Sequence, residues 1–147
     1  MLAVSHLQQR SQADCLPTCA QMALTYLGLK PSYPALLKLL ETRSFGTPFR
    51  NLQRLQQLDV QVTCQACSGD EFPTFLNAGW PLIASVNTAD FGYWSTAVDH
   101  AVLVVGADQQ AIYVHDPSTR SGPTPIALTE FALAQLKFDH LCAIIQR

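Results

Sequence analysis

The chain has 147 residues, of which 48% are apolar, and carries a formal net charge of −2. This is enough apolar material for one core, so we expect a single domain over residues 1–147. The nine lysines and arginines are scattered along the chain, and without a basic face no nucleic-acid partner is predicted.

No stretch reaches the ~18 apolar residues of a membrane span, and the first ten residues lack the pattern of a secretory signal. Five cysteines, an odd number on apolar patterns, fit a reducing compartment, so we expect a cytoplasmic protein.

The first half of the chain has the spacing of helices. Apolar residues recur with a helical period over about 15–27, with Asp14 as a good N-cap and Gly28 as the stop signal. A second helix is predicted over 31–40, and a third carries the apolar residues of 49–58. We therefore expect three helices before the first strand.

The second half changes to the period of strands, interrupted by short helices near 70–78 and 128–136. The predicted strands lie at 60–64, 81–86, 101–105, 111–115 and 141–145. The third and fourth of these read as a hairpin, and the stretches 87–99 and 117–125 read as irregular loops. Helices followed by a mostly antiparallel sheet predict an α+β fold.

Cys15 is the candidate nucleophile, because a thiol at a helix N-terminus meets partial positive charge that favours the reactive thiolate. His100 begins one strand of the predicted hairpin and Asp116 ends the other, so the two side chains should be neighbours. An imidazole can take the proton of a thiol and return it to a leaving amine, and a carboxylate on the far ring nitrogen fixes the tautomer. The three residues therefore predict a cysteine nucleophile that needs no metal or organic cofactor.

Several other residues compete for these roles. Asp99 adjoins the histidine in sequence and should point away from it, and His115 should face away from Asp116 because successive strand residues point to opposite sides. Free cysteines are often small buried hydrophobes, which is our interpretation of Cys19. Cys64 and Cys67 have the spacing of half a zinc site or a redox pair, but no second pair completes a zinc site, so structural thiols are predicted. His6 and His140 have no supporting neighbours and are interpreted as structural or surface residues.

Three separated motifs resemble the bacteriocin-processing cysteine peptidase family, which cuts leaders after a double glycine and belongs to the papain-like superfamily. They are Gln9 with Asp14-Cys15 and Cys19, the run from His100 to Gly106, and Asp116-Pro117. The resemblance, to a standalone member, implies a papain-like fold with N-terminal helices packed on a mostly antiparallel sheet. It also implies that Cys15 is the nucleophile, His100 the base, Asp116 the orienting group and Gln9 a side-chain donor of the oxyanion hole.

An amide N–H from Gln9, together with the backbone N–H of Cys15, would stabilise a tetrahedral oxyanion, and one such donor is worth about 3 kcal/mol. Gln12 is the nearest rival. One departure concerns the substrate: the family's exporter peptidases usually carry glycine after the catalytic cysteine, whereas here Leu16-Pro17 follows. This weakens the case for double-glycine specificity more than the case for thiol chemistry.

We therefore expect a cysteine peptidase acting on a peptide or protein substrate, with leader peptides as the substrates that the resemblance implies. Phe91, Tyr93 and Trp94 lie in the irregular loop before His100, where Tyr93 and Trp94 are candidate substrate-binding residues. Two alternatives stay open. The same triad could transfer the acyl group to an amine or thiol, or the chain could be a non-catalytic leader-binding module. No prediction is made about association with an exporter.

Overall fold

The computed structural model describes residues 1–147 and is built around a six-stranded sheet in the order β1-β6-β2-β3-β4-β5. All neighbouring strands are antiparallel. The strands are β1 (Gln61–Ala66), β2 (Leu82–Asn87), β3 (Asp99–Ala107), β4 (Ala111–His115), β5 (Thr124–Ala127) and β6 (Leu141–Gln146). The α-helices are α1 (Cys15–Tyr26), α2 (Tyr33–Leu39), α3 (Phe72–Asn77) and α4 (Leu128–Gln135). Three 3₁₀ helices are η1 (Phe49–Leu58), η2 (Thr88–Asp90) and η3 (Leu136–Phe138). The predicted α+β class is confirmed.

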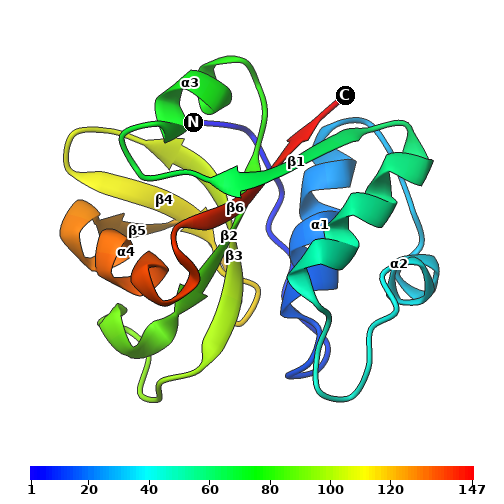
Figure 1. The fold of residues 1–147 in the computed structure, drawn as a ribbon, viewed down its shortest axis with the longest axis horizontal. Coiled ribbons are helices and arrows are strands. Elements are labelled where there is room, and N and C mark those ends of the chain that lie inside the picture. The colour runs from blue at the N-terminus through cyan, green and yellow to red at the C-terminus, as the bar shows by residue number, and fades with distance from the viewer.

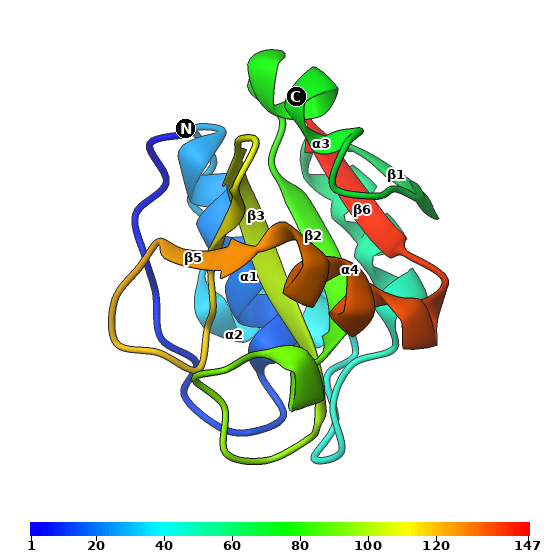
Figure 2. The ribbon, with the colours of Figure 1, turned by 90° about the vertical axis from the view of Figure 1, so that its left-hand side faces the viewer.

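The sheet is buried on both faces. Figure 1 shows α1 and α2 on one side and α4 on the other, and Figure 2 shows α4 in front of the sheet with α1 behind it. Side chains alternate between the two sides along each strand: on β3, Leu103 and Val105 join the core under α1, whereas Val102 and Val104 join the core under α4. This double burial explains why the central strands read as continuous apolar runs.

Helix α1 follows its prediction closely, and it starts at Cys15. The expected capping role of Asp14 is wrong in one respect, because its carboxylate makes no cap hydrogen bond and instead accepts one from the Tyr33 hydroxyl at 2.5 Å. The helix ends before Gly28, whose φ of 89° lies in the left-handed region that glycine tolerates. The hydrogen bond between Asp14 and Tyr33 connects the N-terminus of α1 to α2.

Besides the short η2, which lies within the predicted loop 87–99, two elements differ from the sequence prediction. Residues 49–58 form a 3₁₀ helix, and their apolar residues recur at intervals of three, which matches the three residues per turn of that helix. Strand β5 falls partly within the predicted loop 117–125, where Pro125 argues against a strand; as the edge strand of the sheet, β5 tolerates a proline. None of the helices combines the length and apolar character needed to cross a membrane.

Candidate active site

His100 and Asp116 meet at one end of the sheet. His100 is the second residue of β3, and Asp116 directly follows β4, to which β3 is paired. The Nε2 atom of His100 lies 2.7 Å from Oδ1 of Asp116, and both side chains are buried. The hairpin therefore places the imidazole and the carboxylate as neighbours, as the sequence predicts.

Asp116 is surrounded by hydrogen-bond donors. Its Oδ1 accepts from Nε2 of His100 and from the backbone N–H and hydroxyl of Ser118, at 2.7 to 2.8 Å. Its Oδ2 accepts from the Tyr93 hydroxyl at 2.7 Å and from the indole Nε1 of Trp94 at 2.9 Å. Burial by itself would raise the pKa of Asp116, but His100 and the other donors hold it well below its usual range. The carboxylate is therefore ionised in spite of having no exposed surface.

His100 lies between this carboxylate and Cys15. Burial alone would lower the pKa of His100, but hydrogen bonding to Asp116 and Cys15 and the negative charge of both groups raise it to about 9. Because Nε2 is bound to Asp116, Nδ1 is the ring nitrogen left for the Cys15 thiol. Cys15 and His100 line a cavity of about 300 Å³. A half-buried thiol beside an imidazole that favours its charged form can act as a nucleophile.

Gln9 and Gln12 flank the same region. Gln9 and His100 line a cavity of about 520 Å³, and Gln12 lines both this cavity and the one that contains Cys15. One amide hydrogen of Gln9 is held by the Ser11 carbonyl at 2.8 Å, which leaves its second amide hydrogen unused. The backbone N–H of Gln9 donates to the Pro117 carbonyl, so the segment before α1 is tied to the residue after Asp116.

Tyr93 and Trp94 come from the loop between β2 and β3, and both are bound to Asp116. Trp94 also packs edge-on against the His100 ring, with 5.0 Å between centroids, and lines the cavity that Gln9 shares with His100. Their predicted contact with substrate stays a prediction. The sequence interpretation missed that Tyr93 and Trp94 donate hydrogen bonds to the Asp116 carboxylate. It also assigned no role to Ser118. An Asp-Pro-Ser turn, in which the aspartate binds the N–H two residues on, could have indicated Ser118.

The competing residues make other contacts. Asp99 lines both cavities at the site, but it is exposed and binds Lys137 and Asn87 rather than His100. His115 faces away from Asp116 and lies against His6, at a distance of 2.9 Å between their Nδ1 atoms. His6, which has no partner in the sequence interpretation, is therefore paired in the structure.

The remaining cysteines are free thiols. Cys19 is fully buried one turn after Cys15, and burial raises its pKa well above the usual value, with smaller contributions from Cys15 and Asp116. Cys67 and Cys142 are fully buried together beside Gln135. Cys64 is half-buried, and burial raises its pKa as well. No cluster of side chains in the structure could hold a metal ion.

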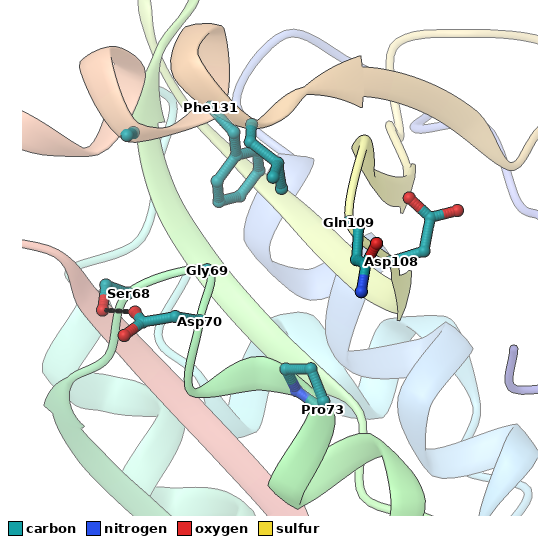
Figure 3. A pocket seen from close by; sticks show the side chains of 9 residues that line it. Ser68, Gly69, Asp70, Pro73, Asp108, Gln109 and Phe131 are labelled. Atoms are coloured by element: carbon teal, nitrogen blue, oxygen red, sulfur yellow. Dashed lines mark hydrogen bonds between the residues drawn. The ribbon is translucent and has the colours of Figure 1, made fainter.

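A larger cavity of about 690 Å³ contains no cysteine or histidine. Figure 3 shows Phe131 of α4 and Pro73 of α3 on its walls, with Asp70 hydrogen-bonded to Ser68. The second carboxylate, Asp108 in the turn after β3, is held by the Tyr113 hydroxyl and two backbone N–H groups. Both carboxylates thus have local partners, and the candidate chemistry lies at Cys15 instead.

Comparisons with known proteins identify the family and the fold. The family model described as "Peptidase_C39 like family" matches residues 1–136. A protein from Bacillus anthracis described as a C39-like peptidase superposes with a TM-score of 0.82 at 16% identity, over 100% of this chain and 96% of that one. The peptidase domain of Streptococcus ComA, a bifunctional ABC transporter, gives 0.76 at 16% identity, over 97% and 98%. A double glycine motif protease from an AMS/PCAT transporter, solved with its leader peptide, gives 0.78 at 16% identity, over 99% and 92%. No curated protein sequence matches the chain.

Proposed function

Since this chain belongs to the Peptidase_C39 like family, we propose that it is a cysteine peptidase in which Cys15, His100 and Asp116 form the catalytic triad. The observation that carries the proposal is the position of His100, which is hydrogen-bonded to Asp116 and lines one cavity with Cys15. These two groups raise the pKa of His100 to about 9. An imidazolium at neutral pH stabilises a neighbouring thiolate, as nucleophilic catalysis by cysteine requires. We further propose that residues 1–147 form one peptidase domain. The five free thiols support a reducing, cytoplasmic location.

The proposed reaction has two steps. The Cys15 thiolate attacks the peptide carbonyl carbon, and the oxyanion that forms receives hydrogen bonds from the backbone N–H of Cys15 and the free amide hydrogen of Gln9. The C–N bond then breaks while Nδ1 of His100 gives its proton to the leaving amine, which leaves a thioester on Cys15. His100, neutral at this point, takes a proton from water, whose oxygen attacks the thioester carbon. The C–S bond then breaks, which releases the acid and restores the Cys15 thiolate beside the His100 imidazolium. Asp116 keeps the same ring nitrogen protonated throughout, so Nδ1 alone exchanges protons.

The proposed substrate is a peptide segment of the leader type. This proposal draws on two neighbours, a double glycine motif protease in complex with a leader peptide and the peptidase domain of an ABC transporter. The cavity at Cys15 also has apolar walls, formed by Leu16, Phe45, Phe49, Phe138 and Leu141. These walls suit a substrate that carries an apolar side chain close to the cut.

Alkylation of the native protein tests the nucleophile. A limiting amount of iodoacetamide near neutral pH should modify Cys15 first, and His100→Ala should slow this reaction by tenfold or more. Cys64 is the matched control, because it is also half-buried but has no imidazole partner and a raised pKa. Preferential modification of Cys64, or modification of Cys15 at an unchanged rate in His100→Ala, would contradict the triad.

Product analysis separates hydrolysis from the two alternatives. Incubation of a leader-type peptide with the protein should give a free carboxylic acid at the cut, and Cys15→Ser should give none. Amine adducts at low concentrations of an added amine would identify an acyltransferase. Binding of the peptide without any cut, by a protein whose Cys15 is alkylated readily, would identify a binding module.

A further inference from the structure

The His6–His115 pair lies between two parts of the proposed site. His6 belongs to the segment that precedes α1 and carries Gln9, and His115 is the last residue of β4, next to Asp116. The two rings are tilted by 46°, with 5.0 Å between their centroids. His115 is buried and His6 is half-buried. A contact between residues 109 positions apart thus fastens the N-terminal segment to the sheet.

The hydrogen bonds of the pair fix how many protons it holds. Nε2 of His6 lies 2.6 Å from the Thr119 carbonyl oxygen, and Nε2 of His115 lies 2.9 Å from the Val4 carbonyl oxygen. A carbonyl oxygen only accepts, so each Nε2 must carry a hydrogen. The two Nδ1 atoms are also 2.9 Å apart, and one of them must donate for this contact to be a hydrogen bond. Because a neutral imidazole carries a single N–H, the pair is complete only when it holds a third proton and one ring is charged.

We propose that His6 and His115 share this third proton as a pH-dependent clasp, which positions Gln9 by holding residues 1–9 against the turn that follows Asp116. Its catalytic consequence rests on the proposed function, because Gln9 is the proposed oxyanion donor. Burial lowers the pKa of His115 and the charge of a protonated His6 lowers it further, whereas the hydrogen bond to Val4 raises it, so the pair resists a second positive charge. His6 and His115 are therefore positioning residues that act through Gln9.

The path from the clasp to Gln9 is short and made of hydrogen bonds. His6 binds the Thr119 carbonyl, and three residues later in the chain the Gln9 N–H binds the Pro117 carbonyl at 2.6 Å. Thr119 itself is fixed to Asp116, because its N–H and its hydroxyl both donate to the Asp116 carbonyl. The clasp and the Gln9 backbone thus bind the same turn. Loss of the His6–His115 contact would therefore weaken the hydrogen bond that holds Gln9.

No other charged group engages the two rings. Neither forms an ion pair with a carboxylate. Asp116, which directly follows His115, is bound to His100, and the Tyr113 hydroxyl of β4 is bound to Asp108. In the surrounding loops Arg10 lies over the Tyr33 ring and Arg120 is exposed. The hydrogen bond between the N-terminal segment and α1 runs from the Leu7 N–H to the uncharged Met22. The proton count of the clasp is consequently set by the two rings themselves.

The sign of the pH effect follows from this count. With three protons the clasp is closed. As the pH rises and the third proton leaves, two lone pairs face each other across the Nδ1 contact and the clasp loosens. At low pH a fourth proton places two N–H groups in opposition and has the same effect. The closed state is therefore confined to an intermediate range, near the pH values at which histidines titrate.

NMR of the ¹⁵N-labelled native chain tests the clasp without any substrate. Long-range ¹H–¹⁵N spectra between pH 5 and 9 should show one of the two rings doubly protonated and then neutral. After correction for the intrinsic rate, exchange of the Gln9 amide should become about threefold to tenfold faster through the same transition, the loss of one net hydrogen bond. Two rings that stay neutral throughout, or Gln9 protection that does not change with pH, would overturn the proposal.

A variant with a matched control separates the clasp from a general effect of pH. In His6→Asn the side-chain amide can donate to Nδ1 of a neutral His115 or accept from Nδ1 of a protonated one, so Gln9 protection should no longer vary with pH. His140→Asn is the control, since His140 lies outside the clasp and its φ of 60° is tolerated by asparagine. The control should keep the native pH dependence. A native pH dependence in His6→Asn as well would overturn the clasp.

Peptide cleavage supplies the catalytic readout. kcat/KM of the native chain should show a step that coincides with the ring titration, and this step should be missing in His6→Asn but present in His140→Asn. The chain could cleave no peptide while the exchange rate of its Gln9 amide changes over the pH range in which the rings titrate. This result would refute the proposed function and support the clasp. Cleavage with an identical pH profile in all three proteins would refute the positioning role.

Discussion

Replacement of Asp116 by asparagine should separate its proposed catalytic role from its structural one. The variant keeps the size of the side chain but exchanges one acceptor oxygen for an NH₂ group. In either orientation of the asparagine amide, its NH₂ group faces an N–H donor that cannot accept a hydrogen bond. If the nitrogen replaces Oδ2, this donor is the indole of Trp94, and if it replaces Oδ1, the donor is the backbone N–H of Ser118. One buried donor left unsatisfied costs about 1–3 kcal/mol, and hydrogen bonds to a charged acceptor are worth about 1.5–3 kcal/mol each. We therefore expect a loss of about 3 kcal/mol in the free energy of unfolding.

The effect on activity should be larger than the effect on folding. With the nitrogen at Oδ1, the His100 ring must present Nε2 as an acceptor, which places a hydrogen on Nδ1 and removes the base at Cys15. The same exchange in a serine protease triad lowers kcat by about 10⁴-fold, and a loss of 10³-fold to 10⁴-fold in kcat/KM is expected here. Peptide cleavage, measured well below the denaturation midpoint, gives kcat/KM, and urea unfolding gives the free energy of unfolding.

Asp99→Asn is the matched control for this experiment. Asp99 precedes His100 in sequence, but its exposed carboxylate pairs with Lys137, and exposed pairs of this kind contribute about 0–1 kcal/mol. Because Asp99 also lines both cavities at the site, kcat is the matched readout. The control should keep its kcat within a factor of about three and unfold almost as the native chain does. Retention of activity within tenfold in Asp116→Asn, or an equal loss in Asp99→Asn, would refute the assignment of the orienting carboxylate.

Two further predictions concern the same cluster. Tyr93→Phe removes one charge-assisted hydrogen bond to Asp116 and leaves the ring, so kcat/KM should fall about tenfold, in line with 1.5 kcal/mol or slightly more, with little change in KM; a change in KM alone would instead support substrate contact. The pKa of His100, raised from 6.5 to about 9, predicts that kcat/KM declines as the pH rises through about 9. Its contribution to folding stability should be complete below pH 6.5 and disappear between 6.5 and about 9. The lowered pKa of Asp116 predicts the opposite pH dependence at acidic pH, where its contribution to folding stability is lost as the pH falls below 3.8. A His100 ring that titrates near 6.5 by NMR would contradict both alkaline effects.

The parts of the site that the sequence predicts are those set by local patterns. A helical period and a stop signal place Cys15 at the start of α1, and two apolar runs joined by a short turn define the hairpin that brings His100 to Asp116. Each of these inferences needs only neighbouring residues and the pairing rule of antiparallel strands. The 3₁₀ form of residues 49–58 was within reach in the same way, because the apolar period there is three and not 3.6.

The parts that the sequence does not predict depend on loops and on distant contacts. Tyr93 and Trp94 reach Asp116 from a loop without periodicity, across 23 and 22 residues respectively. Such a loop takes its path from the surfaces it packs on, among them the stack of Tyr93 on Phe91. His6 and His115 meet only because the N-terminal segment runs along the sheet and donates from Leu2 to the Val105 carbonyl. No local rule assigns a partner to a histidine in a segment that has no regular structure of its own.

The donors around Asp116 also decide which group moves protons in the proposed reaction. A carboxylate whose two oxygens already accept five hydrogen bonds would lose several of them by taking up a proton. Its pKa is displaced downwards while that of His100 is displaced upwards, and each unit of separation adds about 1.4 kcal/mol against proton transfer between them. The proton therefore stays on Nε2 of His100, and the ring can exchange protons only through Nδ1, on the side of Cys15. Loss of any one donor narrows this separation, so Tyr93, Trp94 and Ser118 support the proposed chemistry through their hydrogen bonds to Asp116.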